Sequence, residues 1–208
     1  DYLDASRPPQ PKTNVLFRTN FTNNTDQDQE YSFKTERATR STCDILIENG
    51  FTIGEEISVA LKTPCEVFEA NAGFHREISL TEAHAQTTEE ELIWAVDSQI
   101  KVPPMHKTHA ELIILEDQYM GNFTVKTSFS GKVHVTITNL RDNNSFVKSI
   151  EGNIHEIMKR EIENGLSGFV VNQKIVSFTT KGQCTFRYAT EQHVQLSQEK
   201  LSIENGGV

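Results

Sequence analysis

Apolar and polar residues alternate along most of the chain, with the period of two that is typical of β-strands. The run from 29 to 47 places much Thr and Ser on one parity, which makes it weakly amphipathic and favours a thin, elongated sheet. The expected strands lie within residues 13–23, 29–47, 53–62, 68–80, 81–104, 107–119, 122–140, 166–180 and 183–198.

One segment has the period of a helix instead. Residues 152–165 place four apolar side chains on one helical face, and Gly165 suits a C-terminal cap. Turns are expected at Met120-Gly121 and Lys181-Gly182. This order predicts a mostly β, antiparallel fold with long strands, one short helix and no βαβ unit. Its segments are a linker or tail (1–12), a single module (13–198) and a C-terminal tail (199–208).

The stretch from 50 to 80 contains two half-apolar strands around a proline. If it folds about residues 63–66, each arm has one apolar face and one small, polar or charged face. The apex is then Thr63, Pro64, Cys65 and Glu66. The apolar face holds Ile57, Val59, Leu61, Phe68, Ala70, Ala72 and Phe74. The opposite face holds Glu56, Ser58, Lys62, Glu69, Asn71, His75 and Glu77.

Two interpretations of this hairpin stay open on pattern alone. A transmembrane barrel strand needs about 9–11 residues, apolar toward lipid and polar toward the lumen, and both arms fit. Glu55 and Arg76 interrupt the apolar faces about ten residues from the apex, at a height of about 23 Å, where charges reach the headgroups. A sandwich hairpin, with its polar face in water and its apolar face on a core, also fits.

Composition narrows the classes of function. The chain has 208 residues, 36% of them hydrophobic, and a formal net charge of −9. A negative net charge of this size is not typical of a protein that binds nucleic acid. No run of residues approaches the ~20 apolar residues of a membrane helix. We therefore expect no nucleic-acid partner and no helical membrane span within these residues.

Cysteines and glycosylation triplets bear on covalent modification. Three cysteines allow at most one internal bridge. Cys65 is either a free thiol in a turn or part of a disulfide that holds a resting state, bonded to Cys43 or to another molecule. The third cysteine is Cys184. Triplets for N-glycosylation occur at Asn20, Asn23, Asn122 and Asn143, and they favour a secreted protein.

No constellation of catalytic or metal-binding residues stands out. His106 and His109 have no further ligand at a suitable spacing, and on a strand they would face opposite sides. The sequence contains no phosphate loop, no nucleophile elbow and no Cys/His pair at a known spacing. We therefore expect no enzymatic activity, no metal and no cofactor.

Several stretches form an ordered set. They are "NNTDQDQEYSFKTERATRST", "GFTIGEEISVALKTP" followed by "EISLT", "SQIKVPPMHKTHAELII", "GNFTVKTSFSGKVHVTI" and "CTFRYATEQHVQL". In this order they resemble the pore-forming module of the aerolysin and epsilon-toxin family: a Ser/Thr-rich strand, an insertion hairpin, two strands around Val-Pro-Pro, the next strand pair, and the closing strand of animal members. The resemblance covers residues 13–198.

The resemblance implies an elongated, twisted antiparallel module that is secreted in soluble form. It implies binding to a membrane lipid or to a cell-surface glycan or protein receptor, and then a homo-oligomeric ring, typically about a heptamer. Each copy would insert residues 50–80 as one hairpin of a shared β-barrel. The apolar face would contact lipid, and the opposite face would line the pore and favour cations. Because open strand edges cannot exist in hydrocarbon, oligomerisation must precede insertion.

Two further expectations come from the resemblance. Family members often carry a receptor-binding companion, and the Pro-rich start of the chain is where a companion domain or subunit would be attached. The expected role is a toxin or a host-defence pore former. A non-lytic secreted binding or storage protein that keeps the same scaffold is the alternative.

Overall fold

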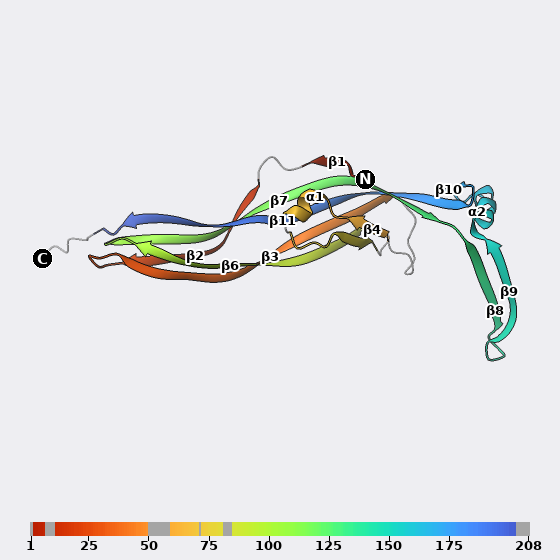
Figure 1. Cartoon of the computed structure of the whole chain (residues 1–208), viewed down its shortest axis with the longest axis horizontal. Coiled ribbons are helices and arrows are strands. Elements are labelled where there is room, and N and C mark those ends of the chain that lie inside the picture. Colours follow the sequence, from red (N-terminus) through yellow and green to blue (C-terminus); the bar gives the residue numbers. More distant parts are fainter. Residues whose placement is uncertain (1, 7–10, 50–58, 71, 81–84, 203–208) are drawn as a thin grey trace.

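Long antiparallel strands run along most of the molecule, and a small helical region with a projecting hairpin lies at one end (Figure 1). The computed structural model describes residues 2–6, 11–49, 59–70, 72–80 and 85–202. The predicted mostly β class, built on long antiparallel strands, is confirmed.

The described residues form eleven strands and two helices. The helices are α1 (Cys65–Glu69) and α2 (Ile154–Glu163). The strands are β1 (Tyr2–Ser6), β2 (Lys12–Asn23), β3 (Gln29–Asn49), β4 (Val59–Lys62), β5 (Glu77–Leu80), β6 (Ala85–Val102), β7 (His106–Phe129), β8 (Lys132–Asn139), β9 (Ser145–Asn153), β10 (Phe169–Asn172) and β11 (Ile175–Lys200).

Seven strands form the main sheet. Their order is β1-β7-β11-β3-β6, with β2 also paired to β7 and β10 to β11. All of these pairings are antiparallel. The longest pairing joins β7 to β11, from Phe129↔Val176 to His106↔Lys200. Strands β4 and β5 form a two-stranded sheet, and β8 and β9 form another.

One of two buried clusters lies toward the end of the body where β11 finishes (Figure 1). There β3 and β6 pack against β2, β7 and β11. Phe33, Ile100 and Leu112 are fully buried in this cluster. The rings of Phe21 and Tyr31 pack beside them with centroids 5.1 Å apart. This packing joins the β3–β6 pair to the rest of the body.

The two expected turns are wrong, because β7 continues through Met120-Gly121 and β11 continues through Lys181-Gly182. A close approach of strands explains the second glycine. A Cβ atom on Gly182 would lie 2.4 Å from the carbonyl oxygen of Leu46 and 2.5 Å from the ring of Phe123. Glycine therefore marks the place where β3, β7 and β11 meet, and not a hairpin.

The element boundaries differ from the expectation in several more places. The expected strand 122–140 is divided between the end of β7 and β8, and the sequence pattern does not predict β9. Strand β1 lies within the segment expected to be a linker, and β6 begins at Ala85, well before the apolar run that indicated it. The sequence pattern does not predict helix α1, so the described part of the chain contains two helices and not one. The predicted helix is confirmed as α2, and Gly165 beyond it has φ +106°. No helix within the described residues is long and apolar enough to cross a membrane.

Asn23 is completely buried, which corrects the prediction of glycosylation at this residue. Its Nδ2 donates to the carbonyl oxygens of Gln27 (2.7 Å), Val102 (2.9 Å) and Pro103 (3.1 Å). Its Oδ1 accepts from the backbone N (3.0 Å) and the hydroxyl (2.7 Å) of Thr25. An amide bonded inside the fold at both ends has no room for a glycan. Asn20, Asn122 and Asn143 are exposed, and glycosylation at these residues stays a prediction.

Candidate functional site

The candidate site is the segment between β3 and β6, which we call the tongue (residues 50–84). The structure describes its residues 59–70 and 72–80. The rest of the predicted hairpin lies outside the described residues, including Glu56, Ile57, Ser58, Asn71 and the side chain of Val59.

The described strands of the tongue are shorter than the expected arms. Strand β4 pairs with β5 from Val59↔Leu80 to Lys62↔Glu77. The returning strand therefore begins at Glu77 and not at Phe68, which corrects the expected arm of residues 68–80.

A helix replaces the tight turn that was expected at the apex. The carbonyl oxygen of Pro64 accepts hydrogen bonds from the backbone N of Val67 (3.1 Å) and of Phe68 (3.0 Å), so the chain turns into α1. Thr63 closes the connection, because its backbone N donates to Arg76 O (2.9 Å) and its hydroxyl to His75 O (2.6 Å). The predicted apex residues therefore lie at the start of a helical connection in this state.

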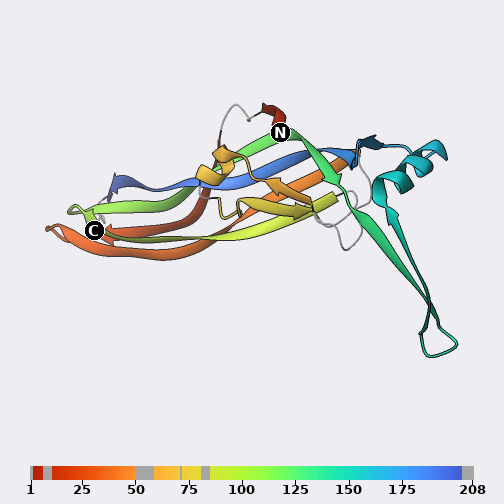
Figure 2. The ribbon, with the colours of Figure 1, turned by 45° about the vertical axis from the view of Figure 1, so that its right-hand side comes forward.

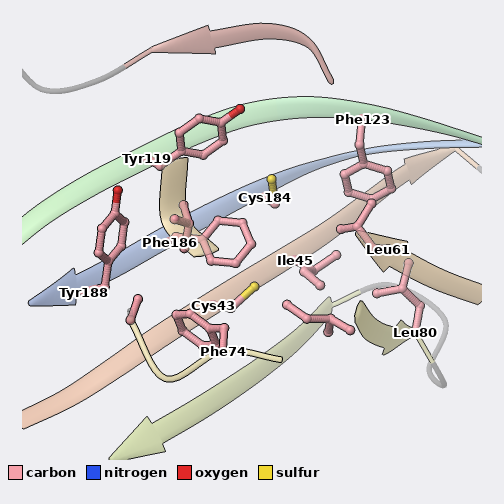
Figure 3. Close-up of a cluster of buried hydrophobic side chains, with 13 residues drawn as sticks. Cys43, Ile45, Leu61, Phe74, Leu80, Tyr119, Phe123, Cys184, Phe186 and Tyr188 are labelled. Atoms are coloured by element: carbon pink, nitrogen blue, oxygen red, sulfur yellow. The ribbon is translucent and has the colours of Figure 1, made fainter. Parts of the chain in front are cut away.

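The apolar face of the tongue packs on the main sheet. Phe74 is 6% exposed, and its ring meets that of Phe186 edge to face at 5.4 Å (Figure 3). From the tongue, the cluster contains Leu61, Val67, Ala72, Phe74, Ile78 and Leu80. From β3, β7 and β11 it contains Cys43, Ile45, Tyr119, Phe123, Cys184, Phe186 and Tyr188.

Phe68 and Ala70, two residues of the predicted lipid-facing set, are more exposed than the buried members of that set. Phe68 on α1 is 49% exposed, and Ala70 is half-buried against the cluster. The described residues of the predicted lumen-facing set are all exposed; they are Lys62, Glu69, His75 and Glu77. The structure thus keeps the two faces apart over most of the described tongue, while contact with lipid or with a lumen stays a prediction.

Burial gives the docked tongue its main stabilisation. Removing a large apolar side chain from water contributes about 1.5–3 kcal/mol. Leu61, Phe74 and Leu80 are each at least 94% buried, so together they contribute on the order of 5 kcal/mol or more before ordering entropy is subtracted. Release of the tongue into water would lose this term, and release into an apolar medium would keep it.

Glycine also shapes the contact between the tongue and β6. Gly73 has φ +82°, and a Cβ atom there would lie 3.0 Å from the side chain of Leu92. This left-handed backbone and short approach favour glycine at the turn that leads to Phe74. Within the described residues, no group of three or more His, Cys, Asp or Glu side chains is suited to a metal ion.

The structure describes all three cysteines, and none forms a disulfide, so the internal bridge from Cys65 to Cys43 is not present. Cys65 is exposed at the start of α1, whereas Cys43 and Cys184 are completely buried in the cluster with the tongue. Burial, with smaller contributions from Cys184 and Asp44, raises the pKa of the Cys43 thiol far above its usual range. A bridge between molecules through Cys65 stays a prediction.

Thiol labelling of the native protein should modify one cysteine per chain quickly. Cys65 is expected to react first. The reaction rate of Cys43 is expected to be lower by about 100-fold or more, because this thiol must be uncovered and then lose a tightly held proton. The measurement is the time course of thiol modification, with Cys65→Ser as the control that lacks the fast phase. Equally fast reaction of all three thiols would contradict the docked tongue.

Sequence reasoning missed the residues that receive the tongue. Tyr119, Phe186 and Tyr188 come from β7 and β11, far along the chain from the tongue. Ile78 and Leu80 share the apolar parity of the returning arm, so alternation alone could have added them to the candidate site. No local signal pairs the tongue with its receiving strands, because that contact depends on strand order in the sheet.

A comparison with protein families finds one that spans nearly the whole chain. The model described as "Clostridium epsilon toxin ETX/Bacillus mosquitocidal toxin MTX2" matches residues 5–205. A comparison with curated protein sequences finds no match.

Solved structures share the fold at low sequence identity. A non-toxic crystal protein from Bacillus thuringiensis is 20% identical with a TM-score of 0.66, and the match covers 96% of this chain and 83% of that one. The Cry23Aa1 and Cry37Aa1 binary complex gives 16% identity, a TM-score of 0.55, and coverage of 99% and 78%. The parasporin-2 toxin of Bacillus thuringiensis, which recognizes cancer cells, gives 13%, 0.54, and coverage of 96% and 72%.

Proposed function

Because the chain belongs to the family of the Clostridium epsilon toxin ETX and the Bacillus mosquitocidal toxin MTX2, we propose that it is a β-pore-forming protein. In this proposal the chain is secreted, binds a membrane lipid or a cell-surface receptor, and assembles into a homo-oligomeric ring. Each copy then inserts its tongue as one amphipathic hairpin of a shared transmembrane β-barrel.

The observation that carries this proposal is the pairing of β3 with β6 on either side of the tongue. Their register runs without a break up to Leu46↔Ala85, and the residue numbers of every pair add up to 131. If the same register continued into the tongue, the turn would fall between Cys65 and Glu66. That position lies inside the apex predicted from the sequence pattern alone.

The extended register also accounts for the two charges on the apolar faces. It would bring Glu55 directly opposite Arg76, where the two side chains could form a cross-strand ion pair. On the polar face it would bring Lys62 opposite Glu69. Both pairs unite opposite charges, which supports a single straight hairpin that continues β3 and β6.

The docked state pairs the tongue in another register. In β4 and β5 the residue numbers of each pair add up to 139, as in Leu61↔Ile78. The extended register would pair Leu61 with Ala70 instead. The two sums differ by eight, an even number, so the side chains of β4 and β5 would keep their faces during the change. Insertion would therefore exchange partners along the strands without turning the apolar face inward.

Lipid would replace the main sheet as the partner of the apolar face. Backbone groups at an open strand edge cannot be satisfied in hydrocarbon, so the hairpins would insert only when neighbouring copies pair with each other. The lumen face would carry more carboxylates, at Glu56, Glu69 and Glu77, than the single ammonium of Lys62, and a cation-selective pore is expected from that charge.

A companion subunit remains part of the proposal for targeting. One matching structure that shares the fold is the binary complex of Cry23Aa1 and Cry37Aa1. A separate receptor-binding chain would supply specificity for a target cell in the same way that a fused domain would.

Leakage of a trapped dye from vesicles and lysis of red cells test the proposed function. Pore formation predicts dose-dependent release together with oligomers that resist SDS on a gel. Protein boiled before addition is the control. Binding to cells without release or oligomers at any dose would refute the pore and favour the non-lytic binding or storage role.

A further inference from the structure

The β8–β9 hairpin has one apolar and one polar face, and both are exposed. Val135 pairs with Ile150, and the two are 48% and 46% exposed. On the other face Glu151 forms ion pairs with Lys132 and with His134, whose Nε2 lies 2.7 Å from Glu151 Oε2. Every residue from His134 to Glu151 is exposed, so no described element covers the hairpin.

The tip of the hairpin concentrates exposed apolar side chains. Leu140 (85%) and Phe146 (67%) are the two most exposed large hydrophobic residues in the described part of the chain. Val147 is 58% exposed and lies at an irregularity in the strand pairing. Arg141 follows Leu140 and Lys148 follows Val147, and Asp142 is the one acidic residue between them. Apolar side chains beside basic ones are the composition of segments that lie in a membrane interface.

An isolated two-stranded hairpin is at best marginally stable in water. This hairpin forms its own two-stranded sheet and projects from the body (Figure 2). Exposed apolar residues that gather at one place mark an interaction site more often than scattered ones do. The tip of the hairpin is therefore suited to a surface that covers these exposed apolar side chains.

Charge is distributed unevenly between this end and the rest of the chain. Residues 130–174 contain six Lys and Arg against five Asp and Glu, whereas the remainder contains fourteen against twenty-four. The net negative charge thus lies entirely outside the end that carries the hairpin. An anionic lipid surface would repel the body and accept this end.

The tongue leaves the body toward the same end. Strand β3 finishes with Asn49 paired to Lys181 of β11, and beyond that point β7 and β11 continue together to Phe129↔Val176. These two strands lead to the region of β8, β9 and α2 (Figure 1). A tongue that continued β3 and β6 would extend in this direction, so the hairpin lies on the side that would meet the membrane.

We infer that the β8–β9 hairpin is a lipid-docking element. Leu140, Phe146 and Val147 enter the headgroup region of the bilayer, and Arg141 and Lys148 contact anionic headgroups. The inference rests on the proposed pore function, because it supplies the first membrane contact before the tongue inserts. It assigns targeting to a segment other than the tongue.

Vesicle flotation tests the docking element with the full chain. The probes are phosphatidylcholine vesicles with and without phosphatidylserine. Leu140→Ser/Phe146→Ser should weaken flotation with the anionic vesicles by about tenfold or more, because both side chains lose their contact with lipid. Added salt should weaken the wild type on these vesicles. The matched control is Ile93→Ser/Leu196→Ser, at residues 66% and 48% exposed away from the hairpin, which should float like the wild type.

The outcomes separate docking from pore formation. Flotation of the wild type without dye release would refute the pore and leave the docking element in place. Dye release and flotation by the double variant at the wild-type level would overturn the docking element while the pore stands. Wild-type protein that does not float with either vesicle also overturns it. If sedimentation shows a wild-type dimer that the double variant loses, and neither floats, the hairpin binds a second copy and not lipid.

Discussion

A disulfide formed in Ala60→Cys/Ser79→Cys should abolish dye release, and a reducing agent should restore it. The two residues are partners in the docked β4–β5 register, and both are exposed, so the bridge leaves the buried cluster intact. In the extended register they would lie eight residues apart along the hairpin, about 26 Å, far beyond the Cα separation of a disulfide. The measurement is release before and after reduction, in a Cys65→Ser background that removes the exposed native thiol.

A second bridge controls for cross-linking itself. Ala38 and Ile93 are exposed partners in β3 and β6, whose register the proposal keeps in both states. Ala38→Cys/Ile93→Cys should therefore release dye at the wild-type level when oxidised. If the oxidised 60–79 variant also released dye fully, the tongue would not change register and the proposed insertion would be wrong.

Phe68→Asp should lower dye release by about tenfold or more while the soluble protein stays folded. Phe68 is 49% exposed on α1, so a carboxylate there keeps its water, and the expected loss of stability is below about 0.5 kcal/mol. In the inserted hairpin the same carboxylate would face lipid, at a cost that depends on depth and recurs in every copy of the ring. Dye release and the urea midpoint of unfolding, measured side by side, check both halves of this expectation.

The choice of Phe68 depends on the tertiary structure. Phe74 shares its predicted face, but it is 6% exposed and packs on Phe186, so a carboxylate at Phe74 would also destabilise the docked state. Val15→Asp on β2 is the matched control, since Val15 is 46% exposed and lies outside the tongue. Full release by Phe68→Asp would place this residue away from lipid.

Alternation along single strands predicted the fold class and many strand positions, because side-chain direction on a strand is a local property. The prediction of turns from glycine was less successful, because a glycine can have either of two structural roles. The sequence pattern predicts a turn at Gly182, but this residue lies inside β11, where Leu46 and Phe123 approach its backbone. A glycine in a strand pattern signals either a turn or a close approach, and only the neighbouring strands decide between them.

Two other residues show how tertiary contacts override local signals. The triplet at Asn23 has the pattern of a glycan acceptor, yet its amide bonds to the carbonyl oxygen of Val102, distant in sequence. Pro64 marks a break in the tongue, as the sequence indicated. The break nevertheless opens a helix and not a tight turn, because the docked tongue bonds Thr63 to His75 and thereby encloses α1.

By itself the sequence determined which residues of β4 and β5 share a face, since that depends only on the period of two along a strand. It also indicated the apex near Cys65, which the β3–β6 register supports. Only the tertiary structure decided what covers the apolar face in this state, namely Phe186 and its neighbours on β3, β7 and β11. The physical reason is that an apolar face requires an apolar partner without specifying it. The order of the strands in the sheet supplies that partner.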